Sequence, residues 1–379
     1  MMDKYKYKVK ITGHTPVIHF EKNISAPALR PTELKSKLDK FLLRKGYKNL
    51  SVKTPDGKKE YFDYKIKINN INIDHSKSRP INKNDKLPFF FGNMGDDYTN
   101  GDKRLVFVKE AEIEFFSFNT EIIKAIKDNF KLFLSITNFG TRQNKGYGSF
   151  SLDKVVVYPN TYKIVINKSN YNEVMKDMEI FYKFIRSGIN LSQRRSSPFY
   201  IKPAIWKYFI EKNIVWEKKA IKRRCFQNKL NEQAIEHNND EILTSEGEER
   251  IVRDVLGLST SQDWRSYRVK VEKENPHIKR FKSPLFFKYI KNPNAYTVYV
   301  SEEKRAEEKL NTFLNKPFRI EAGRCSFDLN VVEEFDVNDF LNWLYKNKNT
   351  IVDELSNGVI SNEYRILKRI LNDMKKVGK

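Results

Sequence analysis

The sequence predicts an α+β fold divided into two domains, on the strength of three observations. Segments in which polar and apolar residues alternate are interleaved with segments whose apolar residues recur at helical spacing. At 379 residues the chain exceeds the usual size of one domain. Hydrophobic residues make up 39% of it, which is enough to form folded cores. We expect one domain over residues 1–160 and a second over residues 161–379.

The expected elements of the first domain follow the order strand, helix, strand, strand, helix, strand. The first helix is expected to begin at Thr32, which could cap it, and to end at Gly46. In chain order the segments are Tyr5–Ile11, Thr32–Gly46, Tyr61–Ile73, Arg104–Phe118, a helix beginning at Thr120, and Phe150–Tyr158. This is the order of the ferredoxin-like fold, in which two helices cover one face of an antiparallel sheet.

The second domain is expected to repeat this fold with additional helices. Thr161–Ile166 has the pattern of a strand, and Glu173–Arg186 has that of an amphipathic helix. Later segments with strand or helix patterns are Tyr267–Val271, Leu285–Tyr289, Tyr296–Val300, Phe318–Leu329, Glu302–Leu314, Val337–Tyr345 and Asn362–Val377. An insertion is expected around residues 214–261, so the prediction is a second, decorated ferredoxin-like domain.

The chain is strongly basic, with 71 Lys and Arg against 48 Asp and Glu, a formal charge of +23 and a pI near 9.6. A polyanionic partner such as RNA or DNA would explain this charge, and so would the Lys- and Asn-rich composition of an AT-rich genome. The charge is clustered, however. Tyr182–Arg224 holds twelve basic and two acidic residues, whereas Cys225–Asp254 holds three basic and eight acidic residues. This patterning favours a nucleic-acid partner.

No stretch approaches the roughly 18–20 apolar residues that span a bilayer, and the first residues alternate in polarity instead of forming a signal peptide. We therefore expect a cytoplasmic protein without a membrane partner. Cys225 and Cys325 lack a second Cys or a His at metal-ligand spacing, so neither zinc nor a disulfide scaffold is expected. No cofactor is expected.

A glycine-rich segment, Asn138–Phe150, lies between the second predicted helix and the last strand of the first domain. Its glycines permit left-handed backbone and close approach to a ligand, while Arg142 and Lys145 could pair with phosphates. It is not a P-loop, because Gly-Lys-Ser/Thr is absent and the helix precedes the glycines. The alternative is a turn whose glycines only serve backbone geometry.

The spacing within this segment resembles the C-terminal glycine-rich loop of the RAMP superfamily of CRISPR-associated proteins. The matching residues are Gly140, Arg142, Gly146, Tyr147, Gly148, Ser149 and Phe150. Other segments similar to RAMP subunits are Thr15-Pro16 with Leu29–Leu38, Arg253–Leu258, and Arg280–Leu285, the last echoed by Arg195–Phe199. Relatives often carry a glycine near Ser36, which this chain lacks. The nearest resemblance is to the two-domain capping subunit of type III-B complexes, which lies at the end of the guide RNA.

The resemblance implies an RNA-binding protein of a CRISPR-type antiviral defence system, which holds the guide RNA (crRNA) backbone by the glycine-rich loop and basic surfaces. Its partners would be this RNA and the other CRISPR-associated proteins of a type III effector complex, unless it acts as a stand-alone member. The RNA-binding candidates are Arg30, Lys35, Lys37, Gly140, Arg142, Lys145, Gly146, Tyr147, Gly148, Arg194, Arg195, Arg280 and Lys282.

Arg194 and Arg195 belong to a basic stretch that also carries aromatic residues, including Trp206 and Phe209. Stacking combined with phosphate neutralisation is how single-stranded RNA is held without readout of its sequence. A helix over Ala204–Glu211 would instead bury part of these aromatics in a core. We keep the two arginines as the RNA-binding candidates of this stretch.

The alternative function is that of a metal-independent endoribonuclease that processes repeat RNA. His14 and His19 follow the first strand, and related enzymes use a histidine as general acid or base when a 2′-OH attacks the neighbouring phosphate. Asp96, Asp97 and Asp102 could hold Mg²⁺, but turns prefer the same residue types and no metal site is expected. A third reading is a basic protein that binds acidic protein partners.

Overall fold

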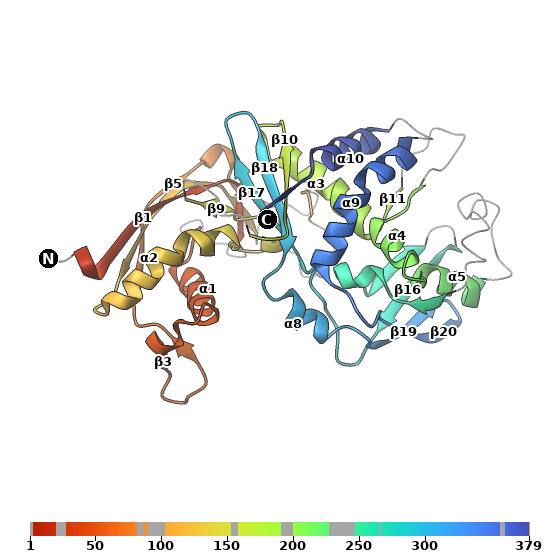
Figure 1. Ribbon diagram of the computed structural model, residues 1–379, viewed down its shortest axis with the longest axis horizontal. Helices are drawn as coiled ribbons and strands as arrows, with labels where there is room; N and C mark the ends of the chain where they lie inside the picture. The colour runs from red at the N-terminus through yellow and green to blue at the C-terminus, as the bar shows by residue number, and fades with distance from the viewer. Residues whose placement is uncertain are drawn as a thin grey trace.

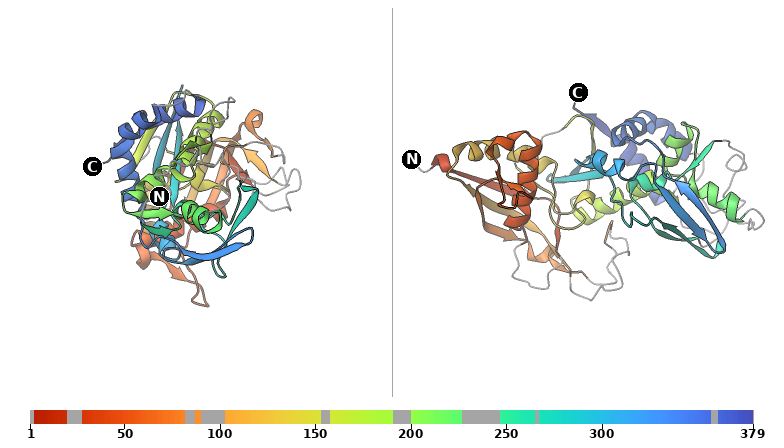
Figure 2. Two further views of the ribbon diagram at one scale, coloured as in Figure 1. Left: turned by 90° about the vertical axis from the view of Figure 1, so that its right-hand side faces the viewer. Right: turned by 90° about the horizontal axis from the view of Figure 1, so that it is seen from below.

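The computed structural model describes residues 3–19, 28–81, 87–89, 103–152, 158–190, 200–226, 247–264, 267–356 and 361–378. Over these ranges the molecule is elongated, with the N-terminal and C-terminal halves of the chain lying end to end (Figures 1 and 2). Helices and antiparallel sheets occur in both halves, so the predicted α+β class is confirmed.

The first half is built on a four-stranded antiparallel sheet with the strand order β5-β8-β1-β9. The strands are β1 (Lys6–Gly13), β5 (Lys65–Ile73), β8 (Val108–Phe116) and β9 (Phe150–Ser151). Two helices, α1 (Pro31–Arg44) and α2 (Thr120–Ser135), pack on one face of this sheet (Figure 1). Alternation in β8 turns Ile113 and Phe115 toward the helices, where Phe130 of α2 lies 5.1 Å from Phe115, ring to ring.

The ends of the two helices have different chemical causes. The side chain of Asn119 accepts a hydrogen bond from the Glu121 amide at 2.9 Å and so caps α2. The expected cap of α1 at Thr32 is wrong, since Arg30 occupies the cap position and Pro31 begins the helix. Proline is favoured there because its fixed φ suits the first turn and its missing N–H would be unpaired anyway.

The second half contains another four-stranded antiparallel sheet, with the order β17-β18-β10-β21. The strands are β10 (Thr161–Ile166), β17 (Leu285–Lys291), β18 (Tyr296–Glu302) and β21 (Lys375–Val377). The helices that cover it include α3 (Tyr171–Arg186), α9 (Val337–Ser356) and α10 (Asn362–Asp373) (Figure 1). The last helix was expected to reach Val377, but it ends at Asp373 because the chain then pairs with β10 as a strand.

Additional elements separate the strands of this second sheet. Between α3 and β17 lie β11 (Ile189–Asn190), β12 (Tyr200–Ile201), α4 (Ala204–Ile210), β13 (Ile214–Trp216), α5 (Glu217–Phe226), β14 (Glu248–Arg250), β15 (Ser261–Trp264) and β16 (Val269–Glu274). Beyond β18 come α8 (Ala306–Asn311), β19 (Pro317–Ala322) and β20 (Cys325–Asn330). Strands β15, β16, β19 and β20 form a third sheet. The single strand expected over Phe318–Leu329 is wrong, because the chain turns at Gly323, whose φ is +66°, to form the β19–β20 hairpin.

Helix α5 lies against this third sheet and is linked to it covalently. Cys225 of α5 and Cys325 of β20 form a disulfide across a sequence separation of 100 residues. The two cysteines were not expected to form a disulfide scaffold, and the structure corrects this for the one pair that they make. Spacing along the chain cannot reveal such a pair, since only the packing of α5 on the hairpin brings the two thiols together.

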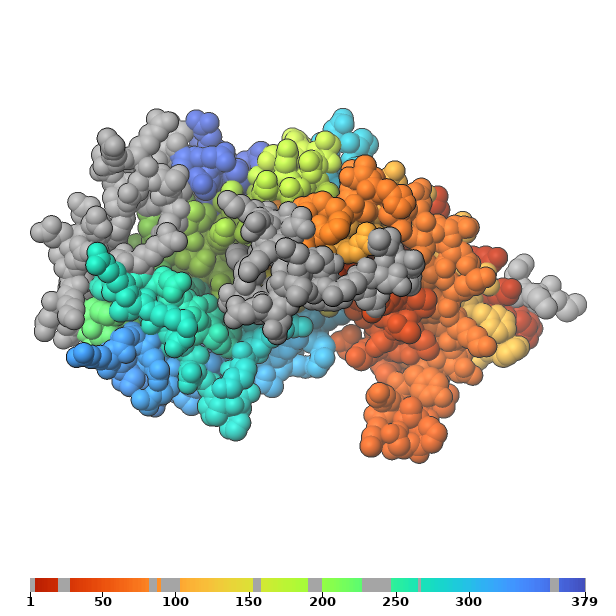
Figure 3. Space-filling model, turned by 180° about the vertical axis from the view of Figure 1, so that it is seen from behind, coloured from red at the N-terminus to blue at the C-terminus, as the bar shows by residue number. Residues whose placement is uncertain are grey.

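The first half also contains two small sheets of short strands. A three-stranded sheet consists of β2 (Val17–His19), β7 (Arg104–Val106) and β6 (Arg79–Pro80), and its Ile18 and Leu105 share a hydrophobic core with residues of the second half. The hairpin of β3 (Val52–Lys53) and β4 (Glu60–Tyr61) projects away from the body of the molecule (orange in Figure 3). Among the residues described, no helix combines the length and the apolar character needed to cross a membrane.

Candidate nucleic-acid interface

The glycine-rich loop lies in the seam between the two halves. It leaves α2, passes through a short 3-10 turn at Gln143–Lys145 and enters β9. Two side chains of the loop bind strand β17 of the second half. The side-chain amide of Asn138 donates to the Phe287 carbonyl at 2.9 Å, and the Ser149 hydroxyl donates to the Tyr289 carbonyl at 2.7 Å. The loop therefore joins the first half to the central hairpin of the second.

Two glycines of the loop are required by close packing. A Cβ on Gly146 would lie 1.9 Å from Cε2 of Tyr289, and a Cβ on Gly148 would lie 2.0 Å from the Phe139 carbonyl oxygen. Both residues also have left-handed backbone, with φ of +94° and +67°. The hydroxyl of Thr15 donates to the Gly146 carbonyl at 2.6 Å, which ties the loop to the Thr-Pro segment after β1.

Lys145 and Tyr147 of the loop point into the seam. The ammonium of Lys145 lies 3.2 Å from the centre of the Tyr182 ring and has no hydrogen-bond partner among the residues that the structure describes. Burial, and then the charges of Arg186 and Arg142, hold the pKa of Lys145 well below its usual range. Tyr147 is fully buried and its hydroxyl donates to the Pro88 carbonyl at 2.9 Å. Their predicted contacts with RNA would require the seam to open, so in this arrangement both residues act in packing.

Three of the predicted RNA-binding cations meet at the edge of the seam. Arg142 is half-buried in the loop, whereas Arg280 and Lys282 are exposed in the segment that leads into β17. Burial, and then the charge of Arg280, lower the pKa of Arg142; burial, and then Arg280, also lower the pKa of Lys282. The Asn144 side chain donates to the Ser283 carbonyl at 3.2 Å and holds the two segments together. We call Arg142, Arg280 and Lys282 the seam cluster.

The predicted candidates of α1 are engaged in contacts within the first half. The Lys37 ammonium donates to the Asn138 carbonyl at 2.7 Å and to the Gln143 side chain at 2.6 Å, so it braces the glycine-rich loop. Lys35 donates to the Phe62 carbonyl at 2.6 Å. Arg30 is half-buried at the start of the helix. Their contact with RNA stays a prediction.

Several predicted residues lie outside the described ranges, namely Arg194, Arg195, Asp96, Asp97 and Asp102. Within the ranges that are described, no group of three or more His, Cys, Asp or Glu residues is placed to hold a metal ion.

His14 is buried between the two halves, with both ring nitrogens engaged. Its Nδ1 accepts a hydrogen bond from the Lys291 amide at 3.0 Å, so Nε2 carries the proton and donates to the Ser151 hydroxyl at 2.8 Å. Burial, followed by the charges of Lys288 and Lys291, lowers the pKa of His14 to about 3. The ring is therefore neutral at physiological pH and unavailable to a substrate. His19 lies at the end of β2, where its Nε2 contacts the Ala28 carbonyl, and its catalytic role stays a prediction.

The low pKa of His14 predicts a loss of stability on mild acidification. Between pH 6.5 and about 3 the unfolded chain binds a proton that the folded protein excludes, so stability falls as the pH falls. From pH 7.5 to 5.5 the expected loss is about 1.4 kcal/mol. Urea unfolding at both pH values should show this loss in the wild type and a correspondingly smaller one in His14→Asn, which cannot titrate. Equal losses in the two proteins would contradict a buried neutral His14.

Sequence reasoning missed Lys288, a second buried cation of the seam. It is 1% exposed in the middle of β17, and its ammonium donates to the Thr137 carbonyl at 2.9 Å and the Asn138 side chain at 3.2 Å. A lysine inside the otherwise apolar run Leu285–Ile290 was the available signal. Such a residue needs buried acceptors, and the loop of the other half supplies the two seen in the described part of the chain.

Comparison with known protein families identifies the family of this chain. Residues 4–189 match the Cmr1 N-terminal domain, and residues 200–376 match the Cmr1 C-terminal domain. The chain belongs to the Cmr1 family. Cmr1 is a RAMP subunit of the type III-B CRISPR effector complex, so the predicted superfamily and the predicted resemblance to a type III-B subunit are confirmed. Other CRISPR-associated proteins are accordingly the partners of this family.

The similar solved structures include the crystal structure of Cmr1 from Pyrococcus furiosus in its apo form. It is 12% identical to this chain, with a TM-score of 0.36, and the match covers 78% of this chain and 87% of that one. No curated protein matches the chain.

Proposed function

We propose that this Cmr1-family protein binds the backbone of single-stranded guide RNA (crRNA) within a cytoplasmic type III-B effector complex and takes part in antiviral defence through binding. The observation that carries this proposal is the seam cluster. Two separate RAMP-like motifs contribute its cations, the glycine-rich loop and the basic-Ser-Pro-Leu segment, and the hydrogen bond from the Asn144 side chain to the Ser283 carbonyl joins these two segments.

The electrostatics of the seam cluster favour a polyanion. Burial, and then the charge of Arg280, lowers the pKa of Arg142 and that of Lys282, so Arg280 adds to the cost of charging both neighbours. A phosphate placed between them would remove this repulsion, and release of its counterions would add to the binding free energy. The guanidinium of Arg280, which is exposed, could hold a phosphate through two parallel N–H donors, and Arg142 would add its positive charge.

The endoribonuclease alternative has less support. A general acid or base needs a ring nitrogen within reach of the ribose 2′-OH or the leaving oxygen. In His14 both nitrogens are used inside the protein, and the ring remains neutral down to about pH 3. Incubation with labelled repeat RNA in EDTA should therefore give no site-specific product, and a product lost in His14→Asn would overturn this reading.

We also infer that the chain divides near residue 160 into two ferredoxin-like domains. The two main sheets share one strand order when their strands are numbered in chain order: second, third, first, fourth. On this proposal the predicted insertion of residues 214–261 belongs to the larger group of elements between α3 and β17.

Neutralising the seam cluster should weaken RNA binding by about tenfold. The variant is Arg142→Gln combined with Arg280→Gln, measured with a labelled single-stranded RNA by fluorescence anisotropy over a range of salt concentrations. Because each phosphate contact on a single strand contributes about 0.7 to the slope of log affinity against log salt, loss of two contacts should lower that slope by about 1.4.

The matched control is Lys124→Gln combined with Lys127→Gln, which removes the same charge from the exposed face of α2. It should bind RNA nearly as the wild type does. If both pairs weakened binding equally, bulk charge and not the seam cluster would hold the RNA. If neither did, the proposed site would be wrong.

A further inference from the structure

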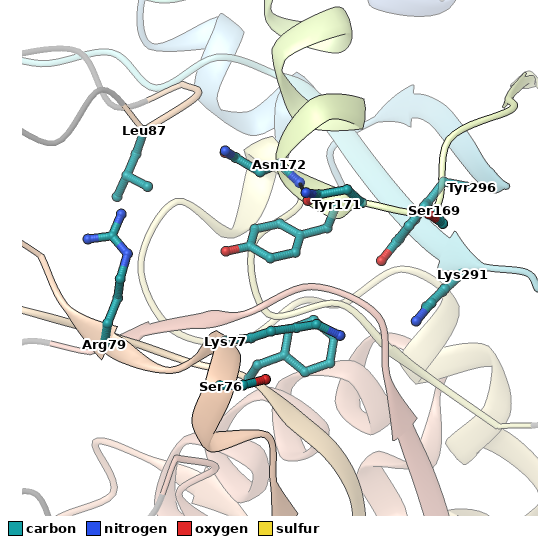
Figure 4. Close-up of a pocket in the computed structure, with 11 residues that line it drawn as sticks. Ser76, Lys77, Arg79, Leu87, Ser169, Tyr171, Asn172, Lys291 and Tyr296 are labelled. Carbon is teal, nitrogen blue, oxygen red and sulfur yellow. Dashed lines mark hydrogen bonds between the residues drawn. The ribbon is translucent and has the colours of Figure 1, made fainter. Parts of the chain in front are cut away.

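A cavity of about 530 Å³ lies between the two halves, beside β6 and the start of α3 (Figure 4). The first half contributes Lys77 and Arg79 to its wall, and the second half contributes Tyr171, Asn172 and Lys291. Its size falls within the roughly 300–1,000 Å³ of typical small-ligand sites. Either half alone would present only part of this wall.

The charged side chains that line the cavity are all cationic, namely Lys77, Arg79 and Lys291. Lys77 is paired with the neighbouring Asp74, with 3.2 Å between the ammonium and the carboxylate. Among the described residues, the Lys291 ammonium has no hydrogen-bond or salt-bridge partner, although its backbone is fixed by the bond from its amide to His14. The cavity thus holds a positioned cation that a phosphate could neutralise.

The cavity also offers an aromatic face and a polar edge. Tyr171 packs against Phe107, with 5.9 Å between the ring centres, and Figure 4 shows its ring extending into the cavity with the hydroxyl on the side of Arg79. The side-chain amide oxygen of Asn172 is buried and has no hydrogen-bond partner within the described ranges. A ring that a base can stack on, an amide and several cations are the elements by which proteins hold nucleotides.

The cavity and the seam cluster are connected through Tyr147. The Tyr147 hydroxyl donates to the Pro88 carbonyl, next to the cavity-lining Leu87. The charge of Arg142 reaches the same phenol, as does that of Arg79. Tyr147 therefore lies within the electrostatic field of both Arg142 in the seam cluster and Arg79 in the cavity wall.

We propose that this cavity holds one nucleotide of the bound RNA strand, with its base stacked on Tyr171 and its phosphate beside Arg79 and Lys291. The inference rests on the proposed RNA-binding function and adds a site to it. The strand would thus be held at two places, by charge at the seam cluster and by stacking in the cavity. Because stacking on tyrosine does not depend on base identity, the cavity would take any base.

The test uses the full-length protein and a labelled ten-nucleotide single-stranded RNA. Tyr171→Leu keeps an apolar side chain against Phe107 but removes the stacking surface, and it should weaken binding by about tenfold. Tyr171→Phe keeps the ring and should stay within about twofold of the wild type. Lys291→Gln should weaken binding severalfold and lower the salt slope, whereas Lys65→Gln, on the exposed part of β5, should do neither.

Crosslinking supplies a readout that altered folding would not imitate. RNA with a photoreactive uridine should crosslink to the peptide that contains Tyr171, and mass spectrometry would identify it. If Tyr171→Leu bound RNA with wild-type affinity while Arg142→Gln/Arg280→Gln bound it weakly, the cavity proposal would be wrong and the proposed function would stand. Failure of the wild type to bind RNA would overturn the proposed function itself. If millimolar mononucleotide abolished the crosslink at Tyr171 while crosslinks at other peptides persisted, the cavity would be a site for a free nucleotide instead.

Discussion

Replacing Lys273 by methionine is expected to destabilise the protein by about 3–5 kcal/mol, the cost of breaking a buried ion pair by removing one partner. Lys273 lies on β16 and is 2% exposed. Its ammonium is 2.5 Å from the Asp254 carboxylate and 3.3 Å from the Glu217 carboxylate, and both acids are buried. Methionine preserves the length of the side chain, so the loss would come from two carboxylates left without their central cation.

The rest of this network cannot replace Lys273. Arg253 approaches Glu217 at 3.5 Å, but in the described part of the chain its Nε and one terminal nitrogen have no hydrogen-bond partner. Arg186 is 3.7 Å from Asp254. These longer contacts compensate the two buried charges only in part, since desolvation penalises an ion that lacks close, well-directed partners.

Urea unfolding at pH 7.5 would measure the loss, with Lys270→Met as the matched control. Lys270 lies on the same strand, three residues earlier, and pairs with Glu272 at 2.5 Å, but it is exposed to solvent. Exposed pairs contribute little to stability, so the control should unfold close to the wild type. Equal destabilisation by the two substitutions would show that the buried network adds nothing specific.

The same network predicts behaviour in acid. Burial alone would raise the pKa of Glu217, but the charges of Lys273 and Arg253 and the Val252 amide bring it down to about 2. Because this value is below the ordinary 4.5, the stabilisation is complete above about pH 4.5 and is lost as the pH falls toward 2. The Lys273→Met variant should lose less stability over that window than the wild type does.

Gly148→Ala should cost about 2–4 kcal/mol, the sum of a left-handed backbone penalty and overpacking. The new Cβ would lie 2.0 Å from the Phe139 carbonyl oxygen. Neither side can withdraw easily, because the Phe139 amide donates to the Gly148 carbonyl at 2.9 Å and the Gly148 amide donates to the Pro16 carbonyl at 2.8 Å. The substitution therefore strains the loop that joins the two halves.

Gly46→Ala provides the control for this prediction. Gly46 also has left-handed backbone, with φ of +92°, but a Cβ there would meet nothing within 4 Å. Its substitution should cost only the conformational part, about 1 kcal/mol. Thermal unfolding of both variants would separate the two contributions, and a similar shift in melting temperature for both would show that packing in the seam is looser than described.

The sequence by itself determined the main elements and the location of the charge. Apolar residues that recur every two residues indicate the buried side of a strand, and a spacing of 3.6 residues indicates that of a helix. Alternation and helical spacing therefore placed β1, α2, β10 and α3. The motif spacing at Gly140–Phe150 likewise indicated the family. A predicted boundary was wrong where two local signals competed. At the start of α1, Arg30 is the cap and the following proline begins the helix, whereas the threonine had been expected to cap it.

Only the tertiary structure decided what these residues do. It buried Lys145 against Tyr182, placed Arg142 beside Arg280, joined Cys225 to Cys325 and surrounded Lys273 with two acids. Each of these contacts joins positions tens to hundreds of residues apart, and no periodic pattern records such a pair. The sequence does not show whether a lysine contacts water, an aromatic ring or a carboxylate. The fold sets these surroundings and, with them, the free energy of the charged side chain.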